Sequence, residues 1–248
     1  MKKPTGRPRL AVPRRIGEAL LAALFPADCL LCGRPLPWRQ KGSVCLSCWH
    51  RLPWRAGMRR RPGPLDAVLW AADYDGAIRR LIRAFKFEGI DYLGRVLGEE
   101  SASRVLPLLG SAVPRPDLVV PVPLHWWRRS RRGYDQALLL ARALARRAGL
   151  PLAAGLLVRR RVGRQLGLSR NARLAALRGA YLVRGTRPGR GTGVPVEGRN
   201  VLLVDDVVTT GATLQACALP LRRAGARTVA GFAVARTPSR RGRGEGEG

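Results

Sequence analysis

The chain has 248 residues, 46% of them hydrophobic, which is enough to build one α/β domain of ordinary size with a small appendage. Its formal net charge is +30, and only four of its 46 basic residues are lysines. Such a charge attracts phosphates or nucleic acid, but a GC-rich genome also enriches a protein in Arg, Ala, Gly and Pro, so the charge alone identifies no ligand. No apolar run approaches the ~20 residues that a membrane-spanning helix needs, so we expect no membrane insertion.

The N-terminal segment is basic and has no hydrophobic period over residues 1–15, which predicts a flexible basic arm. A short amphipathic helix is expected over residues 16–25. The basic residues, the apolar stretch and Cys29 together imitate a lipoprotein signal, but Pro26 and Asp28 stand where small residues should precede the cleavage site. We therefore expect a cytoplasmic protein.

Four of the five cysteines lie in a loop-rich segment that is too small to fold on a hydrophobic core, and we assign residues 16–58 to a small zinc-binding module. Two Cys-x2-Cys pairs, twelve residues apart, can each wrap one side of a tetrahedral metal ion, and Gly33 suits the turn after the first pair. A disulfide framework would need export, and a redox dithiol does not explain two pairs in one small segment. Four protein ligands leave no open coordination position, so the zinc would be structural. The expected ligands are Cys29, Cys32, Cys45 and Cys48.

Beyond a Pro- and Gly-containing linker at residues 59–64, short apolar runs alternate with helical patterns. This alternation indicates an α/β domain with a parallel sheet, which we place at residues 65–237, before a disordered tail at 238–248. The expected strands are 67–72, 118–122, 201–204 and 228–235, the expected helices are 76–87, 92–109, 135–149 and 214–224, and a loop or hairpin is expected at 184–199.

The segment from Val201 to Thr213 places two acids at the end of an apolar strand and a Thr- and Gly-rich turn before a helix. Open α/β sheets bind ligands at this edge. Asp205 and Asp206 can accept hydrogen bonds from vicinal ribose hydroxyls, while hydroxyls and N–H groups at the helix N-terminus can hold a 5-phosphate, which Gly211 lets the backbone approach. A Walker B strand or a receiver-domain acidic pocket would look similar. However, the chain has no G-x-x-x-x-G-K-[ST] loop, and only 35 residues follow Thr213.

Further landmarks accompany this segment. They are Leu81-Ile-Arg-Ala-Phe-Lys86-Phe, Val119-Val-Pro-Val-Pro123-Leu-His125, Arg131-Arg-Gly133-Tyr-Asp-Gln136, Gln165-x3-Ser169 and Arg178-Gly179-Ala-Tyr181. With them, residues 16–237 resemble the ComF family (ComFC/GntX-like). The resemblance implies a zinc-ribbon-like module followed by a type I phosphoribosyltransferase-like α/β domain, whose parallel sheet is flanked by helices. One position departs from the family, which usually has Asn where this chain has Asp135, and the extra negative charge would weaken binding if that position touches a phosphate.

The resemblance also implies roles for individual residues. It assigns 5-phosphoribosyl 1-pyrophosphate (PRPP), or a related ribose 5-phosphate, to Asp205, Asp206, Val207, Val208, Thr209, Thr210, Gly211, Ala212 and Thr213, with Asp205 and Asp206 as catalytic residues and Mg2+ accompanying PRPP. It assigns the pyrophosphate side to Pro121, Val122, Pro123, Arg131 and Arg132. From the residues alone, the two prolines could equally end a strand and the arginines could form a solvated helix start. Lys86 is either a snorkelling surface lysine or part of the site, and no proton-transfer role is assigned to His125 or His50.

Two functions are compatible with these features. One is a PRPP-binding protein of DNA uptake and natural competence, the process with which the family is associated, whose partners would be single-stranded DNA and DNA-uptake proteins. Trp49, Trp54 and the basic arm would then contact the DNA. The alternative is an active phosphoribosyltransferase of nucleotide or base metabolism, in which a nitrogen nucleophile displaces pyrophosphate from C1 of PRPP. The sequence identifies no acceptor.

Overall fold

The computed structural model describes residues 28–37, 42–110, 113–124, 130–160, 179–184 and 195–238. It separates into two compact units, Met1–Arg51 and Leu52–Gly248, which are described one at a time. The basic arm predicted at 1–15, the helix predicted at 16–25 and, except for its first residue, the tail predicted at 238–248 lie outside the described residues. None of the helices in the described ranges is long and apolar enough to cross a membrane.

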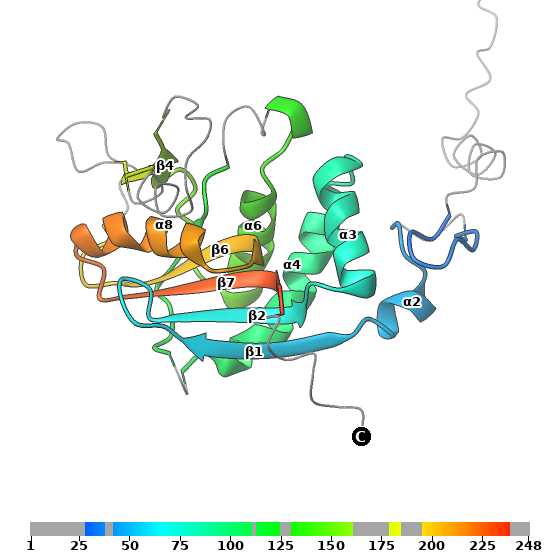
Figure 1. The fold of residues 1–248 in the computed structure, drawn as a ribbon, viewed down its shortest axis with the longest axis horizontal. Helices are drawn as coiled ribbons and strands as arrows, with labels where there is room; N and C mark the ends of the chain where they lie inside the picture. The colour runs from blue at the N-terminus through cyan, green and yellow to red at the C-terminus, as the bar shows by residue number, and fades with distance from the viewer. Residues whose placement is uncertain are drawn as a thin grey trace, which may run out of the picture. The chain divides into compact units, whose positions relative to one another are not determined.

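The second unit is built on a five-stranded sheet with the strand order β1-β2-β7-β6-β3 (Figure 1). The strands are β1 (Trp54–Arg60), β2 (Ala67–Asp73), β3 (Leu118–Pro121), β6 (Asn200–Val208) and β7 (Thr228–Arg236). The pairs β2 with β7, β7 with β6, and β6 with β3 are parallel, whereas β1 runs antiparallel to β2 at one edge. The predicted α/β fold with a parallel sheet is thus confirmed.

The four predicted strands form because they are apolar along most of their length. β2 and β7 are buried at nearly every position, as expected for central strands that are covered on both faces. Residues 118–122 contain β3, with Val122 donating its N–H to the carbonyl of Val204 at 2.9 Å just beyond the strand. The strand predicted at 201–204 extends to Val208, so both aspartates belong to β6.

Helices cover both faces of this sheet (Figure 1). α8 (Ala212–Arg223) lies on one face, where Leu214 and Leu221 share a buried cluster with Val120 and Leu203. α4 (Tyr92–Val105) and α6 (Gln136–Ala148) pack against each other and against the strands on the opposite face, and α3 (Gly76–Phe87) packs against α4. The close approach of α4 to α6 requires Gly98, because a Cβ atom there would lie 2.7 Å from the Cβ of Ala143.

The helices begin and end where the sequence provides the appropriate caps. Asp75 caps α3 by accepting the N–H of Gly76 at 2.8 Å, and Asp135 caps α6 by accepting the N–H of Leu138 at 3.1 Å. Gly149 ends α6 with a left-handed backbone (φ 66°) that donates to the last carbonyls. The predicted helix at 92–109 is α4 followed by a 3-10 turn, η1 (Leu106–Leu108).

Residues 59–64 do not form the predicted linker. Arg59 and Arg60 end β1, and residues 61–66 connect β1 to β2 in an antiparallel hairpin. The boundary at residue 58 that we expected for the zinc-binding module therefore falls inside a strand of the main sheet. The hairpin was not predicted because β1 is a largely exposed edge strand that contains three arginines and lacks the apolar alternation of a half-buried strand.

Three further elements were not predicted. A second, two-stranded antiparallel sheet consists of β4 (Leu157–Arg159) and β5 (Tyr181–Val183), and a short helix, α2 (Leu46–His50), lies in the described part of the first unit. Strands of three residues give no detectable period, so sequence patterns cannot identify them. Of the loop or hairpin predicted at 184–199, residues 185–194 lie outside the described ranges.

Candidate functional site

The candidate ligand site lies at the carboxyl end of β6. β3 pairs with β6 as far as Val204, whereas β7 pairs with β6 through Val208. Residues 205–208 therefore extend beyond the last register pair with β3. This is the crevice beyond the strand ends of a parallel sheet in which α/β proteins bind their ligands.

Asp205 and Asp206 are brought to this edge, but they are successive residues of an extended strand and their side chains point to opposite faces of the sheet. Asp206 faces α3, where its Oδ1 lies 2.8 Å from Nζ of Lys86. The two side chains of this ion pair are only 15% and 17% exposed, so solvent screens their attraction weakly. Lys86 is thereby part of the site region, a role that the sequence left undecided.

Burial raises the pKa of Asp205 to about 7, and the neighbouring negative charge of Asp206 contributes to the increase. The N–H of Asp206 donates to Oδ1 of Asp205 at 2.8 Å, which partly opposes the shift. Ionising both of these adjacent carboxyl groups costs free energy, because their negative charges repel each other. A cation or a hydrogen-bond donor from a ligand would reduce that cost.

The turn between β6 and α8 consists of exposed hydroxyls around a glycine. Thr209 and Thr210 are exposed, and the Oγ1 of Thr210 lies 3.4 Å from the N–H of Ala212. Gly211 is buried and left-handed (φ 77°), a backbone conformation that favours glycine. α8 begins directly after it at Ala212, two residues earlier than predicted. Thr213 consequently lies within the first turn of α8, close to the N–H groups that have no partner within the helix.

The residues predicted for the pyrophosphate side are only partly brought to this edge. Pro121 and Val122 are buried and Pro123 is half-buried, all at the carboxyl end of β3 next to Val204. Arg131 is exposed. Arg132 instead donates from Nη1 to Oε1 of the Gln136 side chain at 3.0 Å, and its guanidinium lies over the ring of Phe87.

The segment around Tyr134 and Asp135 has a structural part in this region. Tyr134 stacks on Phe85 with 5.6 Å between ring centroids, and its hydroxyl donates to the carbonyl of that residue. Asp135 serves as the N-cap of α6, so the departure from the family's usual Asn keeps a good capping residue. Its charge also contributes to raising the pKa of Asp205, after the larger effects of burial and Asp206. His125 lies outside the described residues.

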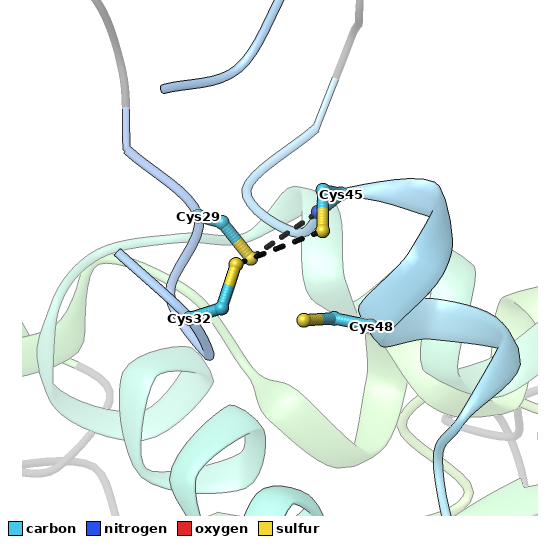
Figure 2. A group of neighbouring side chains, drawn as sticks. All are labelled: Cys29, Cys32, Cys45 and Cys48. Atoms are coloured by element: carbon cyan, nitrogen blue, oxygen red, sulfur yellow. Dashed lines mark hydrogen bonds between the residues drawn. The ribbon is translucent and has the colours of Figure 1, made fainter. Parts of the chain in front are cut away.

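In the first unit, the four predicted ligands converge (Figure 2). The Sγ atoms of the four cysteines all lie within 4.8 Å of one another, and those of Cys32 and Cys45 are 3.8 Å apart. Tetrahedral zinc with Zn–S bonds of about 2.3 Å requires sulfur–sulfur distances of about 3.8 Å, so small shifts of the other sulfurs complete the geometry. The donor set therefore fits zinc.

The backbone around the cluster supports this arrangement. Gly33 adopts the left-handed conformation (φ 70°) that the first pair was predicted to need, and its N–H donates to the carbonyl of Cys29 at 2.9 Å. Cys45 precedes α2, and its N–H donates to Sγ of Cys29 at 3.3 Å. Hydrogen bonds from the backbone and the side chain of Arg34 lower the pKa of Cys32 to about 6, which favours the thiolate that a metal ion binds.

Two family models match the chain. Residues 135–246 match the phosphoribosyl transferase domain family, and residues 20–59 match the double zinc ribbon domain family. The parallel sheet, the acidic strand end and the cysteine cluster thus define a protein with a phosphoribosyltransferase-type domain and a zinc-ribbon module.

Similar proteins identify the family of the chain. It is 32% identical over 180 residues to the DNA utilization protein YhgH of Salmonella typhi, covering 72% of this chain and 75% of the relative. It is also 32% identical over 178 residues to competence protein F of Haemophilus influenzae, covering 69% and 73% of the two chains. The chain belongs to the ComF family.

Among solved structures, the chain is similar to the glutamine PRPP amidotransferase from B. subtilis, complexed with ADP and GMP. The two share 26% identity over 58% of this chain and 26% of the other, with a TM-score of 0.34.

The cysteine cluster predicts about one zinc ion per chain. Cys45→Ser removes one of four ligands and should reduce the zinc content to near zero, with loss of the structure of the first unit. Cys217→Ala is the matched control, since Cys217 is buried in α8 and should leave the zinc content unchanged. Metal analysis by mass spectrometry measures the ratio, and a folded first unit without metal would contradict the assignment.

The raised pKa of Asp205 predicts a specific pH dependence of stability. Because the folded protein holds this proton up to about pH 7 and the unfolded chain releases it near pH 4, stability falls as pH rises between these values. Asp205→Asn should abolish this component, which is about 2 kcal/mol between pH 5 and pH 8. Urea unfolding of both proteins, without ligand or magnesium, measures the difference. Equal pH dependence in the two proteins would show that Asp205 ionises normally.

Proposed function

We propose that the carboxyl end of β6 and the following turn bind PRPP or a related ribose 5-phosphate. The supporting observation is the sequence of groups along the edge, where two carboxylates at the strand end lead into a hydroxyl-rich turn at the N-terminus of α8. In this proposal Asp205 and Asp206 accept hydrogen bonds from the ribose hydroxyls, and the turn through Thr213 holds the 5-phosphate. The full set is Asp205, Asp206, Val207, Val208, Thr209, Thr210, Gly211, Ala212 and Thr213.

The pyrophosphate of PRPP would lie across the crevice at the end of β3, against Pro121, Val122 and Pro123, with Arg131 and Arg132 nearby. Mg2+ entering with PRPP would supply positive charge that offsets the charges of the ligand's phosphates. Lys86 has a distinct part in this arrangement, since its ammonium pairs with the carboxylate of Asp206 while no ligand is bound. Arg132 must leave Gln136 if it is to reach the pyrophosphate.

We infer that the protein uses this site in the handling of DNA during uptake and competence. The support is that its relatives are called a DNA utilization protein and competence protein F. A cytoplasmic location is part of this proposal, because four reduced thiols are needed to hold the zinc ion. The partners would be single-stranded DNA and other DNA-uptake proteins.

A groove between α4 and α6 offers a surface for the DNA backbone. It has a volume of about 700 Å³, and the exposed residues along it include Arg95, Arg142 and Arg146. Arg142 and Arg146 are four residues apart on one face of α6, and the ring of Tyr92 lies below the guanidinium of Arg95. Arginines combined with an aromatic ring are a usual means of binding single strands. Asp91 is the one acidic residue among the described residues that line the groove.

Trp54, which we expected to contact DNA, is instead covered by the guanidinium of Arg104, whose Cζ lies 4.9 Å from the ring centroid.

The PRPP proposal predicts a loss of binding in two variants. Isothermal titration of Mg-PRPP should give binding to the wild type, and Asp205→Asn and Asp206→Asn should each weaken it at least about tenfold, because each removes a charged acceptor. Glu99→Gln removes the same charge from the surface of α4 and should have no effect. Undiminished binding by both aspartate variants would exclude the site.

The alternative, an active phosphoribosyltransferase of nucleotide or base metabolism, is tested with the same variants. Wild-type protein is incubated with PRPP, Mg2+ and a set of purines, pyrimidines and amines, and pyrophosphate is measured. Release that exceeds the Asp206→Asn background with one acceptor would establish turnover and replace the binding-protein proposal. Binding without release for every acceptor is the outcome that the proposal expects.

The groove predicts how single-stranded DNA binds. Arg142→Ala/Arg146→Ala should weaken binding of a fluorescent oligothymidylate and reduce the slope of log K against log salt by about 1.4, since each phosphate contact to a single strand contributes about 0.7. Arg79→Ala/Arg83→Ala is the matched control, with the same charge change, spacing and exposure on α3. Equal losses in both double variants would mean that only the net charge matters.

A further inference from the structure

Arg61 lies directly over the turn that follows β6. A Cβ atom at Gly211 would be 3.4 Å from Cζ of Arg61 and 3.5 and 3.6 Å from its two terminal nitrogens, so the guanidinium is in van der Waals contact with the glycine's face. Arg61 follows β1, some 150 residues earlier in the chain. The fold thus brings a cation from the β1–β2 hairpin onto a segment that has no basic residue of its own between Asp205 and Thr213.

The side chain of Arg61 has an unused hydrogen-bond donor. Its Nε is buried and has no hydrogen-bond partner among the described residues. A guanidinium nitrogen that has lost its water without gaining an acceptor costs free energy, and an anion beside it would remove that cost. Arginine is also the side chain best suited to a planar, bidentate contact with phosphate.

Arg61 and the turn line one cavity of about 360 Å³, a volume suited to a small phosphorylated ligand rather than to a bare ion. Thr209 and Thr210 supply hydroxyls to it, and Arg59 and Arg236 also line it. Within the described part of the lining there is no acidic residue.

The other two arginines differ from Arg61 in their partners. Arg236 is held by Asp73, with 2.9 Å between its Nε and the carboxylate, and it lies over the ring of Trp70. Arg59 is exposed on the edge strand. Once Asp73 is set against Arg236, two positive charges remain, which a phosphomonoester dianion would balance.

The position of Arg61 is fixed by the hairpin. Its N–H donates to the carbonyl of Asp66 at 2.8 Å, which closes the connection between β1 and β2. Asp66 is held in turn by Nη2 of Arg222, at 2.5 and 2.6 Å from the two carboxylate oxygens, and by the N–H of Val229 at 2.7 Å. The backbone that carries Arg61 is therefore anchored to both α8 and β7, which limits the entropy lost when its side chain binds a ligand.

We propose that Arg61 binds the phosphomonoester group of the ligand held by the turn at Thr209 and Thr210, so that the β1–β2 hairpin forms part of the ligand site. This proposal rests on the proposed function, because it places the ligand's 5-phosphate at the same turn. Arg61 supplies the full positive charge that hydroxyls and backbone N–H groups lack.

The test uses titration of the full-length protein with three probes: Mg-PRPP, ribose 5-phosphate and pyrophosphate. Arg61→Met keeps most of the side chain's length and should weaken PRPP and ribose 5-phosphate at least about tenfold, while pyrophosphate is unaffected. Arg61→Lys keeps the charge without the planar fork and should recover part of the affinity. Arg223→Met is the matched control, since it removes an exposed arginine from the opposite end of α8. Equal thermal midpoints of the four proteins would verify that the fold is intact.

The outcomes separate this inference from the proposed function. Unchanged PRPP and ribose 5-phosphate affinity in Arg61→Met would overturn the role of Arg61, while PRPP binding that depends on Asp206 would stand. Equal losses in Arg61→Met and Arg223→Met would also overturn it, as a general effect of charge. If the wild type binds ribose 5-phosphate through Arg61, but Asp205→Asn and Asp206→Asn leave that affinity unchanged, the proposed site at the acids fails and the Arg61 site stands. Binding of neither probe would overturn both.

Discussion

The parallel register of β6 between β3 and β7 is the constraint on which the site depends. Parallel strands end at one edge of a sheet, so the acids of β6, the prolines of β3 and the end of β7 are brought together regardless of their separation in sequence. β3 stops pairing at Val204, four residues before β7 does. The acidic end of β6 is consequently held firmly from one side while the other side opens into the crevice, which makes it both rigid and accessible.

Electrostatics explains why this edge needs partners from distant segments. Two adjacent aspartates in a poorly solvated strand end repel each other. Two features of the fold reduce this repulsion. On one face of the sheet, the ammonium of Lys86 in α3 balances the charge of Asp206. On the other face, the pKa of Asp205 is raised to about 7, which reduces the negative charge of its carboxyl group. A ligand that brings a divalent cation and hydroxyl donors would reduce the same repulsion. In the proposed complex, the ligand would therefore take over the stabilisation that Lys86 and the raised pKa provide in the ligand-free protein.

The sequence predicted most of the second unit because its central elements have strong patterns. The helix at Gly76–Phe87 and the strands at 67–72 and 228–235 were placed within a residue or two, since buried strands and capped amphipathic helices carry their own local signals. The four cysteine ligands were equally legible, because metal geometry fixes their spacing. β1, β4 and β5 were missed, as edge or three-residue strands are determined by their pairing partners rather than by their own residues.

Local sequence patterns predicted even less of the candidate site. The acids and the turn could be located from the segment 201–213 alone, but the side chains that complete them, Lys86 and Arg61, come from elements that are remote in sequence. Arginine is so abundant in this chain that composition cannot distinguish a ligand-binding arginine from a structural one.

The interaction partners of each arginine in the folded structure distinguish the two kinds. Arg222 forms an ion pair with Asp66, and Arg236 pairs with Asp73 and lies over the ring of Trp70. Arg61 reaches the turn with a buried donor that has no acceptor in the described structure, so in a strongly basic protein the informative charge is the one that the fold buries without a partner.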